Sequence, residues 1–145
     1  MQKNNDIVVL NSIYRNAQTG YQAISDILPK TDNAGFRSDL KTQEGQYKAI
    51  VNEASSRLAG LGTEPESVSS IKKASMKVMA EMNTMMNNDT THLAEMMIQG
   101  SNMGITNMTK VLNGYPDPNP DVKNLADRLI TIEHQNIERL KTYLG

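Results

Sequence analysis

The chain contains no cysteine and no tryptophan, and it has only one phenylalanine and five tyrosines. The absence of cysteine excludes disulfides, thiolate metal sites and a cysteine nucleophile within this sequence. With so few aromatic residues, the apolar content consists mainly of Leu, Ile, Met and Ala, and ten residues are methionine. Such a composition favours helices over sheets.

Neither sign of charge dominates, and no long apolar run is present. The formal net charge is -1, so no overall basic field points to nucleic acid or to an anionic membrane as a partner. The N-terminal sequence "MQKNNDIVVLNSIYRN" has a four-residue apolar run before polar residues return. We therefore expect no signal peptide, no membrane span and a cytoplasmic location. A chain of 145 residues fits one domain, spanning 1–145, with a sizeable core.

Apolar residues recur at spacings of three and four, which predicts long amphipathic helices. Five helical segments are expected, over about 6–28, 33–61, 65–87, 90–114 and 121–144. The second stripe contains one glutamine and consists of Phe36, Leu40, Gln43, Tyr47, Ile50, Ala54 and Leu58. The last contains one asparagine and consists of Val122, Leu125, Leu129, Ile132, Asn136, Leu140 and Tyr143.

The connections between these segments predict the topology. Short links make the first two helices antiparallel neighbours, and the stiff loop "YPDPNPD" does the same for the last two. A helix over 65–87 would be about 34 Å long, which matches the length of the bundle. We therefore expect an all-α, up-down bundle of two antiparallel hairpins joined by a helical crossover. A plain five-helix bundle is the alternative.

Two glycines interrupt the fourth segment in the stretch "QGSNMGI". Each glycine within a helix costs about 1 kcal/mol relative to alanine. Gly100 and Gly104 therefore indicate either a close approach by a neighbouring helix or space left for polar side chains.

Four stretches resemble the ferritin-like superfamily, and are closer to its small bacterial branches than to ferritin itself. They are "LNSIYRNAQTGYQAISDIL", "FRSDLKTQEGQYKAIVNEASSRLAGLG", "LAEMMIQGSNMGITNMTKVL" and "IEHQNIERLKTYL". Di-iron members place one Glu on each of two helices and Glu-x-x-His on each of the other two. The resemblance puts these six ligand positions at Gln18, Gln43, Gln46, Ser101, Glu133 and Asn136, or at Glu44 and Tyr47 in another register of the second helix.

Only one of the six positions in the first register keeps an anionic ligand. Neutral amides cannot offset the four positive charges of two divalent ions in a dry core. We therefore expect Gln18, Gln43, Gln46, Ser101 and Asn136 to form a mid-bundle polar network, with Tyr21 or Tyr47 as further donors. A weak metal site and a small-ligand pocket are the alternatives at the same place.

Other residues are candidate ligands for iron or another divalent metal. These are Glu44, His92, Glu95, Glu133 and His134, and the two histidines are equally consistent with surface positions. A methionine cluster, comprising Met76, Met79, Met82, Met85, Met86, Met96 and Met97, suits core filling, Cu(I) binding or an adaptable face for a second subunit.

No nucleotide-binding, nucleophile-elbow or zinc-protease motif is present. The sequence therefore favours a non-enzymatic bundle without a cofactor, whose di-metal site is degenerate and whose role is structural or in protein interaction, with a homodimer as one form. A metal-binding or metal-dependent oxidase-type protein with an altered ligand set is the alternative.

Overall fold

Four long α-helices make up nearly all of the chain that the computed structural model describes, residues 2–65 and 89–145. They are α1 (Gln2–Ile27), α2 (Ala34–Gly60), α4 (Thr90–Gly114) and α5 (Pro120–Lys141), with a short 3₁₀ turn η1 (Leu28–Lys30) after α1. The four helices agree with four of the five predicted segments. The predicted crossover helix at 65–87 falls, apart from its first residue, outside the described residues.

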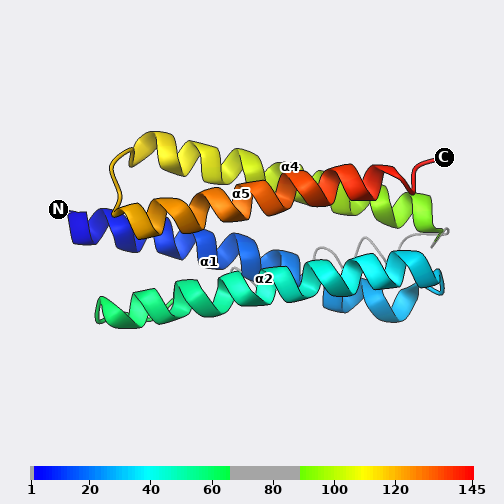
Figure 1. Ribbon diagram of the computed structural model, residues 1–145, viewed down its shortest axis with the longest axis horizontal. Coiled ribbons are helices and arrows are strands. Elements are labelled where there is room, and N and C mark those ends of the chain that lie inside the picture. Colours follow the sequence, from blue (N-terminus) through cyan, green and yellow to red (C-terminus); the bar gives the residue numbers. More distant parts are fainter. Residues whose placement is uncertain (1, 66–88) are drawn as a thin grey trace.

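The helices form a bundle of two antiparallel hairpins (Figure 1). α1 packs most extensively against α2, and α4 against α5, and smaller contacts of α1 with α4 and α5 and of α2 with α5 close the bundle. α2 and α4 run in the same direction, so α2 ends at the opposite end of the bundle from the start of α4. The prediction of an all-α bundle of antiparallel hairpins is thus confirmed.

Side-chain caps explain where three of the helices begin. Asn33 Oδ1 accepts a hydrogen bond from the Phe36 amide at 2.9 Å, and Asp89 Oδ1 accepts one from the His92 amide at 2.7 Å. Asn119 does the same for Asp121, directly before a proline at the first turn of α5. Each cap satisfies an amide that has no partner within its helix.

The N-terminal helix departs from the predicted boundary. The sequence predicts a start near residue 6, but α1 begins at Gln2 and includes Asn5 and Asp6. The Asp6 carboxylate instead accepts a hydrogen bond from the Asn119 amide at 2.8 Å, and Asp6 is 6% exposed. The sequence could not reveal this because the partner lies more than a hundred residues away.

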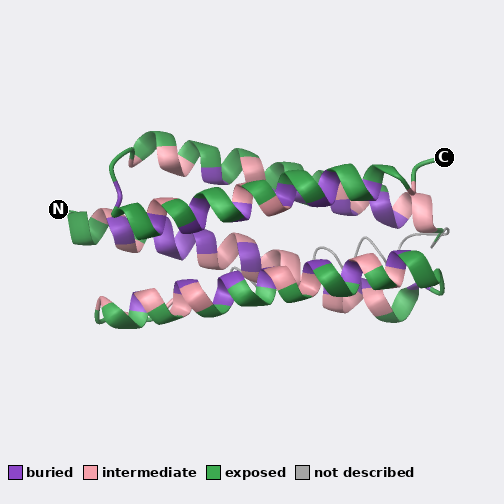
Figure 2. Cartoon of the chain, viewed as in Figure 1, coloured by how far each residue is buried: buried purple, intermediate pink, exposed green. Residues whose placement is uncertain are grey.

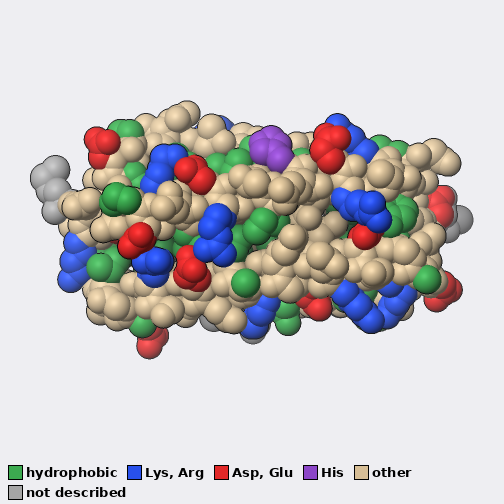
Figure 3. All heavy atoms as spheres, in the orientation of Figure 1, with side chains coloured by type: hydrophobic (Ala, Val, Ile, Leu, Met, Phe, Trp, Pro, Cys, Tyr) green, Lys and Arg blue, Asp and Glu red, His purple; other side chains and the backbone are tan. Residues whose placement is uncertain are grey.

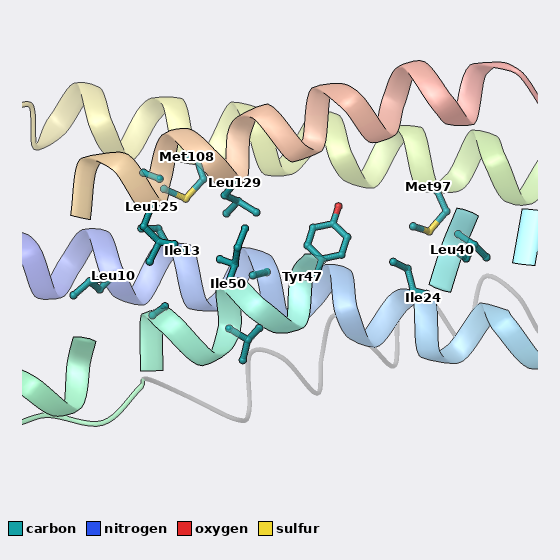
Figure 4. Close-up of a cluster of buried hydrophobic side chains, with 14 of the residues drawn as sticks. Leu10, Ile13, Ile24, Leu40, Tyr47, Ile50, Met97, Met108, Leu125 and Leu129 are labelled. Carbon is teal, nitrogen blue, oxygen red and sulfur yellow. The ribbon is translucent and has the colours of Figure 1, made fainter. Parts of the chain in front are cut away.

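The core lies along the bundle axis, and each of the four helices contributes buried residues to it (Figure 2). Every member of the stripe predicted for α2 is buried, including Gln43 and Tyr47. Buried apolar side chains lie on both sides of Tyr47, with Leu10, Ile13 and Leu129 toward one end and Ile24, Leu40 and Met97 toward the other (Figure 4). Tyr47 therefore marks a level at which the apolar core is interrupted.

The buried Asp6 contact gives a first stability prediction. Asp6→Ala should lower the free energy of unfolding by about 1 to 2 kcal/mol, because a charge-assisted hydrogen bond that anchors the loop before α5 is lost. Urea denaturation measures the effect. Asp127→Ala is the control, because Asp127 forms an exposed ion pair with Lys123 and should change stability by less than about 0.5 kcal/mol. Equal effects of the two variants would contradict the anchoring role.

Candidate functional site

Polar side chains from three helices meet at the level of Tyr47. Tyr47 comes from α2, Ser101 from α4, and Glu133 and Asn136 from α5, and each is at most 5% exposed. The Tyr47 hydroxyl interacts with all three of the others, and it points away from α1 and α2 toward the opposite hairpin (Figure 4). We call these four residues the polar cluster.

Glu133 is the carboxylate of the polar cluster, and its environment disfavours the charge. Burial raises the pKa of Glu133 from 4.5 to about 7, although hydrogen bonding from Ser101 and Tyr47 lowers it in part. Its Oε2 atom is buried and has no hydrogen-bond partner among the described residues. The group is therefore near its titration midpoint at neutral pH and retains an unused acceptor.

Tyr47 stays protonated over the whole working range of pH. Burial raises the pKa of its hydroxyl far above the ordinary value, and the nearby Glu133 charge raises it further. Within the polar cluster, Glu133 is thus the group whose charge changes near neutrality. Tyr47 serves as a fixed hydrogen-bond donor to it.

Two glycines make room for this arrangement. A Cβ atom on Gly20 of α1 would lie 2.8 Å from Cζ of the Tyr47 ring, closer than real Cβ contacts. A Cβ atom on Gly104 of α4 would lie 3.2 Å from Oε1 of Glu133. The expectation that the α4 glycines leave space for polar side chains therefore holds at Gly104, whereas a Cβ atom on Gly100 would meet no atom of the described residues within 4 Å.

A pocket of about 440 Å³ opens between α1 and α4 and reaches the polar cluster. Tyr47, Ser101 and Glu133 belong to its lining. The α1 side is formed by Asn16, Thr19, Gly20, Ala23 and Ile27, and the α4 side also by Met96, Met97, Gln99, Gly100, Met103, Gly104 and Asn107. Its volume lies in the range of sites for small organic ligands.

The rim of the pocket is held by amides. Asn16 Nδ2 donates to Asn107 Oδ1 at 2.8 Å and also lies 2.9 Å from the Ser12 carbonyl oxygen. This bond bridges α1 and α4 next to the opening. Asn16 therefore links the two helices that form the walls.

The structure separates the predicted metal ligands. His92 and Glu95 form a surface pair on α4, with 3.8 Å between Nδ1 and Oε2, and His134 is exposed on α5. Glu44 is half-buried and accepts a hydrogen bond from Ser25 at 3.0 Å. Of the five candidates, Glu133 is the one that reaches the polar cluster.

The residues predicted to form the mid-bundle network are placed at different depths. Ser101, Asn136 and Gln43 are buried, whereas Gln18 and Gln46 are half-buried. Neither amide atom of Gln43 has a hydrogen-bond partner among the described residues, and the same is true of Asn136 Nδ2 and Gln46 Oε1. Ser101 and Asn136 thus meet around Tyr47 and Glu133, and no hydrogen bond joins one predicted amide to another.

The methionine cluster is described only in part. Five of its seven members lie within 66–88, outside the described residues. Met96 and Met97 line the pocket on α4 together with Met103, which is 68% exposed. Thioether side chains adapt their shape readily, so this wall can accommodate different apolar outlines.

The donor set of the polar cluster does not fit a metal centre. No group of three or more His, Asp or Glu side chains able to hold a metal ion occurs within residues 2–65 and 89–145. A di-metal site needs several carboxylates to neutralise two hard cations, and the polar cluster offers one.

No helix in the described ranges has the length and hydropathy to cross a bilayer.

Sequence reasoning missed Gly20 and the rim residues Asn16 and Asn107. Gly20 lies on the inward side of α1, between the buried Ala17 and Ile24, so the reasoning applied to Gly100 and Gly104 would have identified it. Asn16 and Asn107 have no comparable signal, because asparagines in exposed parts of helices are common.

Comparison with known proteins assigns neither a family nor a function to the chain. No protein-family model, curated protein or solved structure matches the chain.

Proposed function

We propose that the chain is a non-enzymatic ferritin-like helical bundle, in which a polar cluster occupies the place of a di-metal centre and whose role is structural or in protein interaction. The observation that carries the proposal is the composition of this cluster. Its side chains are a tyrosine, a serine, an asparagine and one carboxylate.

The topology supports the ferritin-like part of the proposal. Ferritin-like bundles consist of two hairpins joined by one long crossover. Here α2 and α4 run in the same direction, so the end of α2 and the start of α4 lie at opposite ends of the bundle (Figure 1). A simple up-and-down bundle with short links would instead place the start of α4 beside the end of α2.

The charge balance supports the non-enzymatic part. Two divalent cations beside one carboxylate would leave most of their charge uncompensated in a core where the polar cluster is almost fully buried. The same neutral donors are suited to hydrogen bonding with Glu133. The polar cluster therefore favours one register of α2, α4 and α5 without a metal.

The surface is consistent with binding to a partner rather than to nucleic acid. Positive and negative side chains alternate over the face seen in Figure 3, without a large field of either sign. Met103 is the most exposed large apolar side chain among the described residues. A homodimer through the methionine cluster stays a prediction, since most of that cluster lies outside the described residues.

Metal loading combined with thermal melting tests the proposal. Protein purified without chelator should contain no stoichiometric metal, and excess Fe(II), Mn(II), Zn(II) or Cu(I) should not raise its Tm through the polar cluster. A ligand that binds only the native state must raise Tm with concentration. Glu133→Gln distinguishes metal binding at the polar cluster from metal binding elsewhere, because it removes the one carboxylate of the cluster.

Two outcomes would overturn the proposal. One is stoichiometric metal whose stabilising effect disappears in Glu133→Gln. The other is oxygen consumption with Fe(II) that depends on Glu133. An increase in Tm that persists in Glu133→Gln but is lost in His92→Ala would instead identify a surface site on α4 and leave the proposal intact.

A further inference from the structure

A purely structural polar cluster does not require the pocket between α1 and α4. We infer that this pocket binds a small organic molecule with an apolar body and a protonated amine, and that the amine pairs with the Glu133 carboxylate. The inference goes beyond the proposed structural role and assigns the chemical class of a ligand. It follows from the shape of the pocket, the chemistry of its walls and the charge at its inner end.

The walls are suited to an apolar body. Ala23 and Gly100 leave the space between the two helices open because they carry little or no side chain. Met96 and Met103 supply adaptable thioether surface at the opening. The pocket is thus both wide enough for a ring or a branched chain and largely apolar.

The inner end is suited to a hydrogen-bond donor with positive charge. Glu133 is 3% exposed, yet it lines the pocket and its Oε2 atom has no partner among the described residues. A buried acceptor without a partner is costly, and an ionised one is more costly still. An ammonium group placed there would form a charge-assisted hydrogen bond and supply the missing positive charge.

No protein cation takes this place within the described part of the chain. The groups that face Glu133 are neutral: the Tyr47 hydroxyl from α2, Ser101 from α4 and Asn16 from α1 at the rim. Asn136 from α5 completes the surroundings, and the described lining contains no Lys, Arg or His. The charge complementarity therefore favours a cationic ligand over a neutral or anionic one.

Three probes of matched shape test the inference by isothermal titration calorimetry. They are phenylpropylamine, phenylpropanol and phenylpropanoate, which share one apolar body and differ in the charge of the polar group. At pH 8 the amine should bind at least about tenfold more tightly than the alcohol, and the carboxylate most weakly. Between pH 8 and pH 6 the affinity for the amine should fall about tenfold as Glu133 takes up a proton, while that for the alcohol stays unchanged.

Three variants locate the binding. Glu133→Gln should remove the preference for the amine but keep binding of the alcohol. Gly100→Leu should abolish binding of both, because the added side chain lies at the pocket and its Cβ atom meets no described residue within 4 Å, so the described core is not disturbed. Glu138→Gln, on the exposed side of the same helix and paired with Lys141, should behave like the unaltered protein. Thermal melts establish that each variant is folded.

Several results would overturn the inference. Equal affinity for the three probes would show that charge is not recognised, and tightest binding of the carboxylate would show the opposite preference. Failure of all probes to bind at millimolar concentration would show that the pocket does not accept such molecules. Amine binding that persists in both Glu133→Gln and Gly100→Leu would place the site elsewhere.

Discussion

Raising the pH from 5 to 9 should lower the free energy of unfolding by about 3 kcal/mol through Glu133 alone. Its pKa is about 7 in the folded protein and 4.5 without the fold. A difference of this size corresponds to about 3 kcal/mol, because each pKa unit is worth about 1.4 kcal/mol. Between the two values the folded state binds more protons than the unfolded state, so stability falls as pH rises. The penalty is absent well below pH 4.5 and complete above about pH 8.

Denaturation by urea at a series of pH values, compared between the unaltered protein and Glu133→Gln, isolates this effect. Glutamine has nearly the same shape and never ionises, so the two proteins should have similar stability at pH 5. At pH 9 the variant should be the more stable by up to about 3 kcal/mol. Tyr47 does not contribute, because the pKa of its hydroxyl is raised far above this range.

Glu138→Gln provides the matched control on the same helix. Glu138 is exposed and its ion pair with Lys141 is a surface contact, so this variant should follow the pH dependence of the unaltered protein. A stability difference between Glu133→Gln and the unaltered protein that stays constant from pH 5 to pH 9 would show that Glu133 does not titrate in this interval. The buried carboxyl would then have a cation or another partner beside it.

Gly20→Ala should lower the free energy of unfolding by about 3 kcal/mol, although alanine is the better helix former. The added Cβ atom would lie within 3.0 Å of three atoms of the Tyr47 ring. Overpacking of a buried site costs about 1 to 3 kcal/mol. The upper end applies here because the ring is 1% exposed and its hydroxyl is tied to the polar cluster. Thermal and urea denaturation measure the loss.

Gly45→Ala is the matched control for Gly20→Ala. Gly45 is an exposed glycine within α2, and a Cβ atom there would lie farther than 4 Å from the other parts of the chain that the structure describes. This variant should therefore gain about 0.5 to 1 kcal/mol from helix propensity. If Gly20→Ala were equally stabilising, the close contact between α1 and the ring would be refuted.

A double-mutant cycle assigns the cost of Gly20→Ala to its partner. In a Tyr47→Leu background the ring is gone, so Gly20→Ala should cost at least about 1 kcal/mol less than in the unaltered protein. An unchanged cost would place the clash elsewhere in α1.

The sequence predicted the helices and their inward faces well because both depend on local chemistry. The helix predicted over 90–114 coincides with α4, and the residue before α2 caps it. The stripe predicted for α2 is buried throughout, which also settles the register there: Gln43 and Tyr47 face inward, while Glu44 is half-buried and bound to Ser25. These features follow from the spacing of apolar residues and from capping.

The site could be predicted only in part because it depends on the position of each helix along the bundle axis relative to its neighbours. The predicted stripes place Tyr47 and Asn136 on inward faces, but they do not include Glu133, which the structure buries. Nor do they show which inward residues of different helices lie at the same level, or that Gly20 lies against the Tyr47 ring. Gln43 illustrates the same limit, since its position was predicted to join a network of amides and its amide has no partner among the described residues.

The pairing of helices has a consequence for how the chain folds. The most extensive contacts join helices adjacent in the described chain, α1 with α2 and α4 with α5. Contacts between residues near in sequence form quickly, so each hairpin can assemble before the other is present. The polar cluster takes Tyr47 from the first hairpin and Ser101, Glu133 and Asn136 from the second, and it therefore completes only when the two preformed halves dock.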